Sequence, residues 1–392
     1  MRQLFVFVAL VLIGCTQKDG GGKSLDPMTN AKLSFGTSID FNSPDNYANQ
    51  PKPSYITKDN IGGNGIIDKQ ATLGRILFYD KNLSIDNSIA CGSCHKQTFA
   101  FGDTAIQSAG VSNGKTIRHS MRLINARFAN ESKFFWNERA SSLDVQTTMP
   151  IQDHLEMGFS GQSGRGNMAT LLAKLQAIPY YPELFTWAYG DNQVTESRMQ
   201  RALAQFIRSI QSFDSKYDVG RAITGNDQAP FPNFTAMENQ GKALFLTPPV
   251  FNVNGDRVSG GFGCQGCHQA PEFDIDPNSR NNGIIGVIGS SDLDVGVTRA
   301  PSLRDIVNEQ GNLNGPLMHT GAVRGLINML GHYNDINAPA RNTNLDPRLK
   351  PNNIGQKLLM TPNEMTAVVQ FLRTLSGKNI YVDKKWSDPF VK

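Results

Sequence analysis

The chain has 392 residues, enough for two or three domains, and its hydrophobic fraction of 39% can supply modest cores. Its longest apolar run, residues 4–13, is ten residues long, whereas a helix needs about 20 to cross a bilayer, which excludes an integral membrane protein. The net charge of +4 comes without a long basic run or an interleaved aromatic and basic stripe, so we expect no nucleic acid partner.

The N-terminus has the pattern of an export signal. Residues 1–14 contain Arg2, a short apolar stretch and a small residue before Cys15. The ending Leu-Ile-Gly-Cys resembles the bacterial lipobox, whose cysteine is acylated, although a plain signal peptide with an incidental cysteine is the alternative. We expect an exported, periplasmic protein that is anchored at the cell envelope through lipid on Cys15. Residues 15–60 are rich in Gly, Asn, Asp and Pro with little periodicity, which predicts a flexible tether.

The other four cysteines form two Cys-x-x-Cys-His motifs, the attachment pattern of c-type haem. The motif residues are Cys91, Cys94 and His95 in the first motif and Cys264, Cys267 and His268 in the second. Two thioether bonds fix the porphyrin edge to one turn of chain, and the adjacent imidazole reaches the iron from one face. Disulfides, a redox dithiol or one zinc site are the alternatives, but zinc modules separate their cysteine pairs by roughly 15–20 residues. Here the gap exceeds 160 residues, so the sequence predicts two covalent haems.

Each haem motif follows a similar segment, Leu-Gly-Arg-Ile-Leu-Phe at 73–78 and Gln-Gly-Lys-Ala-Leu-Phe at 240–245. Both segments look like amphipathic helices that pack on a haem. We therefore predict a mostly α fold of two cytochrome c-like domains, residues 61–230 and 231–392, each with one covalently bound c-type haem. Strand signals are scarce. Further helices are predicted at 167–178, 195–212, 322–333 and 361–375.

The segment between the haem motifs carries a more specific pattern. Residues 134–140 read Phe-Phe-Trp-Asn-Glu-Arg-Ala, residues 142–146 read Ser-Leu-Asp-Val-Gln, and residues 154–158 read His-Leu-Glu-Met-Gly, with Met-Pro at 149–150. This series resembles the bacterial dihaem cytochrome c peroxidase and MauG family, whose pattern runs roughly F-W-D-G-R-A, S-L-x-x-Q, a proline, then x-x-E-M-G. The resemblance covers about residues 65 to 375.

The resemblance implies roles for three residues. Trp136 would lie between the haems as an electron relay, while Gln146 and Glu156 would line the open face of the first haem. The intervals fit, with ten residues from Trp136 to Gln146 and ten more to Glu156. Cleavage of bound peroxide requires a proton to move from the inner oxygen to the outer one, which a positioned carboxylate can perform. Apolar residues beside Glu156 in the sequence are expected to raise its pKa by desolvation.

Residues 118–123 depart from the family pattern R-N-x-P-S-L. The asparagine associated with an interdomain calcium ion is replaced by His119, while the backbone carbonyls of Asn314 and Pro316 would be the other ligands. Because calcium prefers oxygen donors, the imidazole weakens the expectation of a calcium ion. Two other roles are open for His119: a cap on the open face of the first haem, or a hydrogen-bonded histidine at the domain interface.

The second haem needs a distal ligand, which the family draws from the helix after the P-x-x-H-x-G motif, here residues 316–321. Fourteen residues after His319, where the peroxidases carry methionine and MauG carries tyrosine, stands Tyr333. Met329 lies one helical turn earlier on the same face and is the rival ligand, whereas His332 is expected to face solvent. A third reading is that Tyr333 is only packed and another group binds the iron. The choice matters because the axial ligand sets the haem potential.

The resemblance implies a peroxidase that reduces hydrogen peroxide to water with electrons from a small periplasmic donor, such as a monohaem cytochrome c or a cupredoxin. The first haem would be open and the second six-coordinate. One alternative is a MauG-like oxidase that modifies residues of a partner protein. The other is a dihaem electron carrier without enzyme activity, which requires two six-coordinate irons.

Overall fold

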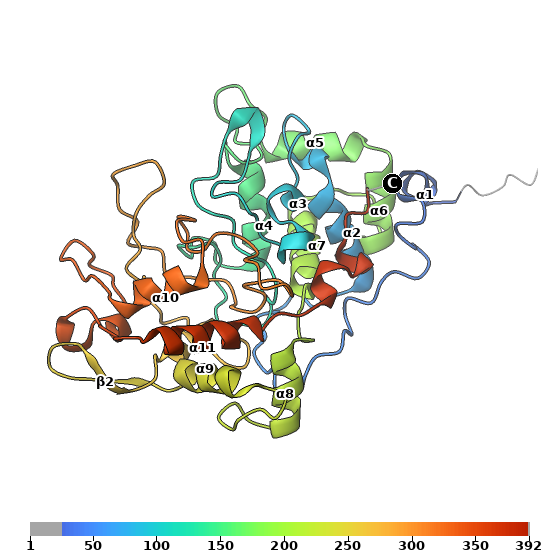
Figure 1. Ribbon diagram of the computed structural model, residues 1–392. Coiled ribbons are helices and arrows are strands. Elements are labelled where there is room, and N and C mark those ends of the chain that lie inside the picture. Colours follow the sequence, from blue (N-terminus) through green and yellow to red (C-terminus); the bar gives the residue numbers. More distant parts are fainter. Residues whose placement is uncertain (1–25, 391–392) are drawn as a thin grey trace, which may run out of the picture.

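The computed structural model describes residues 26–390 and is mostly helical (Figure 1), which confirms that part of the predicted fold. Two short antiparallel pairs, β1 (Pro249–Phe251) with β2 (Arg257–Gly260) and β3 (His268–Gln269) with β4 (Asp274–Ile275), are its strands over these residues. In that same range, no helix is both long and apolar enough to cross a membrane. The α-helices of the described residues are α1 (Thr29–Phe35), α2 (Asp68–Tyr79), α3 (Cys91–Cys94), α4 (Leu143–Gln152), α5 (Met168–Ala177), α6 (Tyr180–Tyr189), α7 (Glu196–Ser209), α8 (Lys216–Thr224), α9 (Ala236–Leu246), α10 (Leu326–Asn334) and α11 (Pro362–Arg373).

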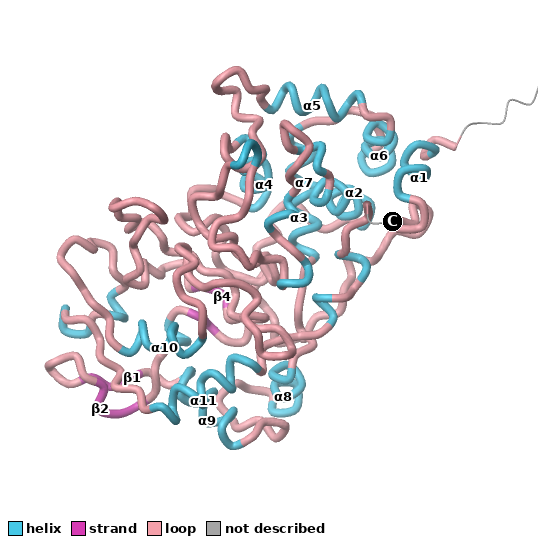
Figure 2. The backbone as a smooth tube through the Cα atoms, turned by 45° about the horizontal axis from the view of Figure 1, so that its top comes forward, coloured by secondary structure: helices cyan, strands magenta, loops and turns pink. Residues whose placement is uncertain are grey.

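The predicted helices at 167–178, 195–212, 322–333 and 361–375 correspond to α5, α7, α10 and α11. The helix ends follow local chemistry: the hydroxyl of Thr195 accepts from the backbone N–H of Arg198 and caps α7, and Thr361 caps α11 in the same way. Helices α1, α4, α6 and α8 were not predicted from the sequence. Figures 1 and 2 place α2, α4 and α7 on one side of the molecule and α9, α10 and α11 on the other.

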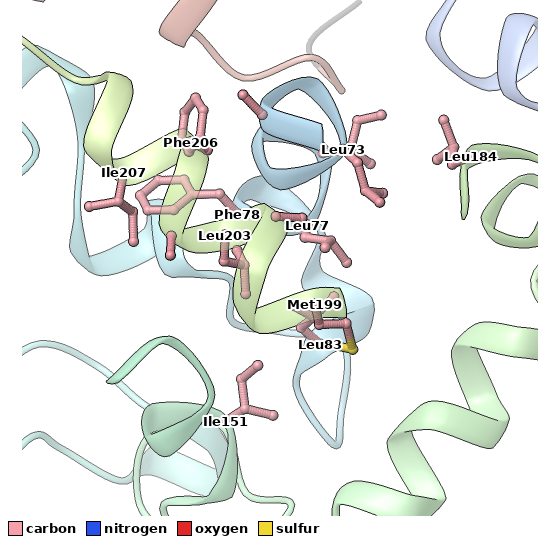
Figure 3. Close-up of a cluster of buried hydrophobic side chains, with 14 of the residues drawn as sticks. Leu73, Leu77, Phe78, Leu83, Ile151, Leu184, Met199, Leu203, Phe206 and Ile207 are labelled. Atoms are coloured by element: carbon pink, nitrogen blue, oxygen red, sulfur yellow. The ribbon is translucent and has the colours of Figure 1, made fainter. Parts of the chain in front are cut away.

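Helices α2 and α7 form the centre of one buried hydrophobic cluster, here called the first core. The rings of Phe78 and Phe206 lie 5.1 Å apart, and Leu77 and Leu203 lie beside them (Figure 3). A Cβ atom at Gly74 would lie 2.0 Å from the backbone oxygen of Ala202, so only glycine permits the two helices to approach so closely. The glycine of the 73–78 segment therefore sets the distance between α2 and α7.

Helices α9 and α11 pack in the same way in a separate hydrophobic cluster, the second core. Here a Cβ atom at Gly241 would lie 1.9 Å from the backbone oxygen of Ala367. The rings of Phe245 and Phe371 have their centroids 5.3 Å apart. The repeated Gly-x-x-x-Phe of the two segments thus encodes one repeated helix pair, with the glycine at the crossing and the phenylalanine one turn further on.

The flexible tether predicted for residues 15–60 is wrong over residues 26–60. Phe35 of α1 and Phe41 and Tyr47 after it are buried in the first core, and the Tyr47 hydroxyl donates to the backbone oxygen of Lys385 at 2.6 Å. Aromatic side chains scattered through a polar segment produce no periodicity, yet each can be buried singly. The predicted signal peptide and Cys15 lie outside the described residues.

The two cores do not follow the domain boundary expected near residue 230. Tyr217 of α8 already belongs to the second core, because its ring packs 5.0 Å from that of Phe273. At the other end, Ile380 and Trp386 return to the first core, and the Tyr79 hydroxyl donates to the Trp386 carbonyl at 2.7 Å. The last described residue, Phe390, accordingly lies near α1, with its ring centroid 5.1 Å from that of Phe35.

Candidate functional site

A cavity of about 130 Å³ lies over the first haem motif and brings together His95, Gln146 and Glu156. His95 follows α3, and its Nδ1 lies 3.1 Å from the backbone oxygen of Phe101. Gln146 and Pro150 are four residues apart on α4, so both face the cavity from one side of that helix. The structure thus gathers the residues that the sequence pattern had singled out.

The backbone beside Asp153 positions Glu156. One carboxylate oxygen of Asp153 accepts from the N–H groups of Leu155 at 2.8 Å and Glu156 at 3.1 Å, which fixes the turn after α4. Burial, reinforced by the negative charge of Asp153, raises the pKa of Glu156 to about 7, and the guanidinium of Arg139 opposes the rise. Glu156 can therefore exchange a proton at neutral pH.

A larger cavity of about 570 Å³ lies in the second half and is lined by Cys264, Cys267 and His268. Tyr333 and Met329, the two candidate distal ligands, both line it. Because both are present, the cavity accommodates either assignment. Burial raises the pKa of Tyr333 above its usual range, so the phenol stays protonated unless a cation binds its oxygen.

Asn282 is a cavity residue that the sequence reasoning missed. Its side-chain amide donates to the Tyr333 hydroxyl at 3.0 Å and lies 3.2 Å from the sulfur of Met318. Its backbone oxygen lies 2.9 Å from Nε2 of His332, which is half-buried, so the expectation that His332 faces solvent is wrong. Met318 also lines this cavity, and its position directly before His319 in the P-x-x-H-x-G motif could have indicated this from the sequence. No local pattern marks Asn282.

Trp136 lies between the two cavities and is nearly buried, with 8% of its surface exposed. Its indole N–H donates to the carbonyl of His119 at 2.7 Å, and its own carbonyl accepts from Thr298 at 2.9 Å and Arg299 at 3.0 Å. The first bond fixes the indole ring, and the other two fix the backbone of Trp136 against residues 298–299. The residues that line both cavities, here called the shared wall, are His119, Ser120, Met121, Arg122, Trp136, Ile275, Arg299, Ala300 and Pro301.

His119 joins the two halves directly. Its backbone N–H donates to the carbonyl of His319 at 2.8 Å, and its Nδ1 lies 2.9 Å from the carbonyl of Ala105. This geometry favours the hydrogen-bonded interface histidine over the haem cap.

The calcium ion expected at the backbone carbonyls of Asn314 and Pro316 stays a prediction, and the position of His119 argues against it. A Cβ atom at Gly315 would lie 3.4 Å from Nε2 of His119, so an imidazole nitrogen faces the 314–316 segment where calcium would need an oxygen. The side-chain amide nitrogen of Asn314 donates to the Asp305 carbonyl and the Tyr381 hydroxyl, both at 2.8 Å, and its side-chain oxygen is buried without a partner among the described residues. Pro316 lines the second cavity. We assign calcium no role.

The donor groups of both halves fit c-type haem. All four thiols in the described residues are free, and Cys91 packs on the first core whereas Cys264 packs on the second, which argues against one shared zinc ion. The contact of His95 Nδ1 with a carbonyl oxygen makes that nitrogen the donor and leaves Nε2 to bind iron. His268 has a buried Nδ1 without a partner among the described residues, in a cavity lined by both of its cysteines.

Comparison with known proteins agrees with this donor set. The sequence model for di-haem cytochrome c peroxidases matches residues 68–228. Over 340 residues the chain is 28% identical to the methylamine utilization protein MauG of Methylophilus methylotrophus, which covers 83% of this chain and 89% of that protein. Over 352 residues it is 26% identical to the cytochrome c551 peroxidase of Pseudomonas aeruginosa, with coverages of 85% and 86%.

A solved structure, that of a MauG-like protein associated with microbial copper homeostasis, superimposes with a TM-score of 0.67 at 25% identity. The match covers 88% of this chain and 99% of that one. Relatives that are named peroxidases support an oxidoreductase, and the di-haem family implies two c-type haems. From its two haem motifs, its two cavities and these relatives, we conclude that the chain belongs to the family of dihaem cytochrome c peroxidases and MauG proteins.

Proposed function

We propose that the protein reduces hydrogen peroxide to two molecules of water, consuming two protons and two electrons from a small electron-donor protein. The observation that carries this proposal is Glu156, a carboxyl group with a pKa of about 7 beside the cavity of His95. A cytochrome that only carries electrons has no need of a protonatable group at that place. Two cytochrome c-like domains, one around each core, are part of the proposal.

Glu156 is the proposed acid and base. With a pKa of about 7, it is present both as carboxylate and as carboxylic acid at neutral pH. It can accept the proton of the inner peroxide oxygen and return it to the outer one, which then leaves as water. Desolvation in the cavity keeps this carboxyl available in both forms.

Gln146 and Arg139 complete the cavity around that carboxyl. The amide of Gln146 offers both a donor and an acceptor for orienting bound peroxide. Arg139 is held over the ring of Phe135, 3.5 Å from its centroid, and its positive charge limits the rise in the pKa of Glu156. Held by Cys91, Cys94 and His95, a haem would supply the iron at which peroxide is bound and reduced.

Trp136 is the proposed electron relay, because its indole ring lies in the shared wall and is fixed at its nitrogen. Cys264, Cys267 and His268 would hold the second haem, with Tyr333 as the proposed distal ligand and Met329 as its rival. We also propose that the mature protein is exported to the periplasm and anchored by lipid on Cys15. Replacement of Cys15 by serine should release the protein from the membrane fraction, and retention of the variant there would contradict the anchor.

One observation favours a second candidate, a MauG-like oxidase that modifies residues of a partner protein. Tyr333 lines the second cavity and has its hydroxyl hydrogen-bonded by Asn282. An anionic tyrosinate ligand stabilises ferric iron, so the second haem would not serve as a high-potential electron store. Reaction with peroxide without prior reduction would fit this candidate, and a need for prior reduction would fit the conventional peroxidase.

The test of the main proposal is the stoichiometry of turnover. Protein with both haems is mixed with peroxide and a reduced monohaem cytochrome c or a reduced cupredoxin, and both reactants are followed. We expect two donor molecules oxidised for each peroxide consumed. A protein with both haems that consumes no peroxide with either donor contradicts the peroxidase proposal and favours the electron carrier.

A further inference from the structure

The shared wall carries two arginines, Arg122 and Arg299, each in contact with both cavities. Apart from His119, they are the only ionisable side chains in that wall.

Neither guanidinium has a carboxylate partner within 4.0 Å among residues 26–390. Arg122 donates from one terminal nitrogen to the carbonyl of Ser302 at 2.9 Å, whereas its Nε is buried without a partner. Arg299 lies over the ring of Phe134, 4.5 Å from its centroid, and one of its terminal nitrogens is likewise buried without a partner. Burial lowers the pKa of each arginine to about 10.

The buried Arg304 shows which partner Arg122 and Arg299 lack. Arg304 is 0% exposed, and its two terminal nitrogens donate to the Asp218 carboxylate at 2.9 Å and 3.0 Å. An unpaired buried charge is costly, which is why buried arginines normally have such a partner. Arg304 also has a buried Nε without a partner, so the difference is the carboxylate that Arg122 and Arg299 lack. That lack points to an anion that enters the two cavities.

A c-type haem carries two carboxylates, its propionates, on the porphyrin edge opposite the two thioether bonds. The shared wall contains no residue of either Cys-x-x-Cys-His motif, as expected if the propionate edges face it. We propose that Arg122 and Arg299 bind the propionates of the two haems and that Arg122, in contact with both cavities, joins one haem to the other through its guanidinium. The planar guanidinium suits this role because it offers paired donors to carboxylates.

The proposal has an electrical consequence. The reduced haem carries one positive charge fewer than the oxidised haem. A nearby cation in a poorly solvated wall therefore destabilises the oxidised form relative to the reduced form, and this raises the reduction potential. Removal of that charge should lower the potential of each haem that the arginine contacts. The inference requires two bound haems and does not depend on peroxide turnover. It can therefore fail while the proposed function holds, and the proposed function can fail while the inference holds.

The test compares Arg122→Gln and Arg299→Gln with the wild type, each shown by intact mass to carry two haems. Resonance Raman spectra report the bending modes of the propionates, and spectroelectrochemical titration reports both potentials. We expect shifted propionate modes in both variants. For Arg122→Gln, the oxidised-to-reduced ratio of both haems at a fixed potential should rise about tenfold, which is 59 mV for one electron.

Arg118→Gln is the matched control. Arg118 lines the first cavity but not the second, and its Nε donates to the Asp294 carboxylate at 2.9 Å, so its charge is already paired. The control should leave the propionate modes unchanged. If Arg122→Gln does not retain both haems, Arg122→Lys keeps the charge and loses the planar donor pair, and it should still shift the propionate modes. Propionate modes identical to those of the wild type, in variants that carry both haems, overturn the proposal.

Discussion

The two halves of the molecule, one around the first core and one around the second, have the same helix crossing but different ionisable residues in their cavities. In each half a helix before the haem motif crosses a later helix at a glycine, Gly74 against Ala202 and Gly241 against Ala367. The first cavity receives a protonatable carboxyl, Glu156, whereas the second receives the phenol of Tyr333. The two halves thus repeat one helix crossing, while the ionisable side chains that line their cavities differ.

The largest expected effect is the loss of the haem that we expect at Cys264 and Cys267. Replacement of both Cys264 and Cys267 by serine removes both thioether bonds of the second motif. Protein made in a host with cytochrome c maturation should then carry one haem instead of two by intact mass, about half of the wild-type haem content. The matching pair, Cys91 and Cys94, should give the same loss in the other half. Zinc in place of haem in the wild type would contradict the whole assignment.

Glu156→Gln tests the chemical difference between the halves. The substitution keeps the shape of the side chain and removes its acid and base function, so turnover should fall by roughly 10²–10⁴. Steady-state peroxide consumption measures this, while an unchanged haem absorption spectrum shows that the site is intact. Glu309→Gln serves as a control, because Glu309 is an exposed residue paired with Lys378 at 2.7 Å. Wild-type turnover in Glu156→Gln would remove this residue from the mechanism.

The glycine crossings test the similarity of the halves. A methyl group at position 74 or 241 would lie within 2.0 Å of a backbone oxygen, so each Gly→Ala change should destabilise the protein by about 1–3 kcal/mol through overpacking. Thermal or denaturant unfolding measures the loss. Gly331→Ala in α10 is the control: a Cβ there meets nothing within 4 Å, and alanine favours a helix by about 1 kcal/mol over glycine. Two unequal losses would show that the two crossings are not equivalent.

The smallest effect is a pH dependence of stability that comes from Glu156. Its folded pKa of about 7 lies above the ordinary value of about 4.3, so the folded state binds the proton more tightly than the unfolded state does. Its contribution to stability is present below the ordinary pKa and is lost as the pH rises through about 7. The unfolding temperature of Glu156→Gln, relative to the wild type, should therefore rise between pH 4 and pH 8. A constant difference would contradict the raised pKa.

Much of the candidate site could be predicted because its residues stand at short, regular intervals. The two haem motifs, the amphipathic helices and the ten-residue spacing of Trp136, Gln146 and Glu156 are local features of the chain. Local spacing constrains local geometry, so helices α5, α7, α10 and α11 could be expected from periodicity alone. The tertiary structure then placed Gln146 and Glu156 at one cavity with His95.

The sequence alone determined two Cys-x-x-Cys-His motifs, the mostly helical class of the fold, and His95, Gln146 and Glu156 as residues of one site. Only the tertiary structure decided that Phe35, Phe41 and Tyr47 are buried and that Asn282 lies beside Tyr333. It also decided that Arg122 and Arg299 line the same two cavities. The physical reason is distance along the chain. Such contacts join segments that lie up to hundreds of residues apart in the chain. Their energy depends on which side chains are buried and on the partners that they find there, and a local sequence pattern contains neither.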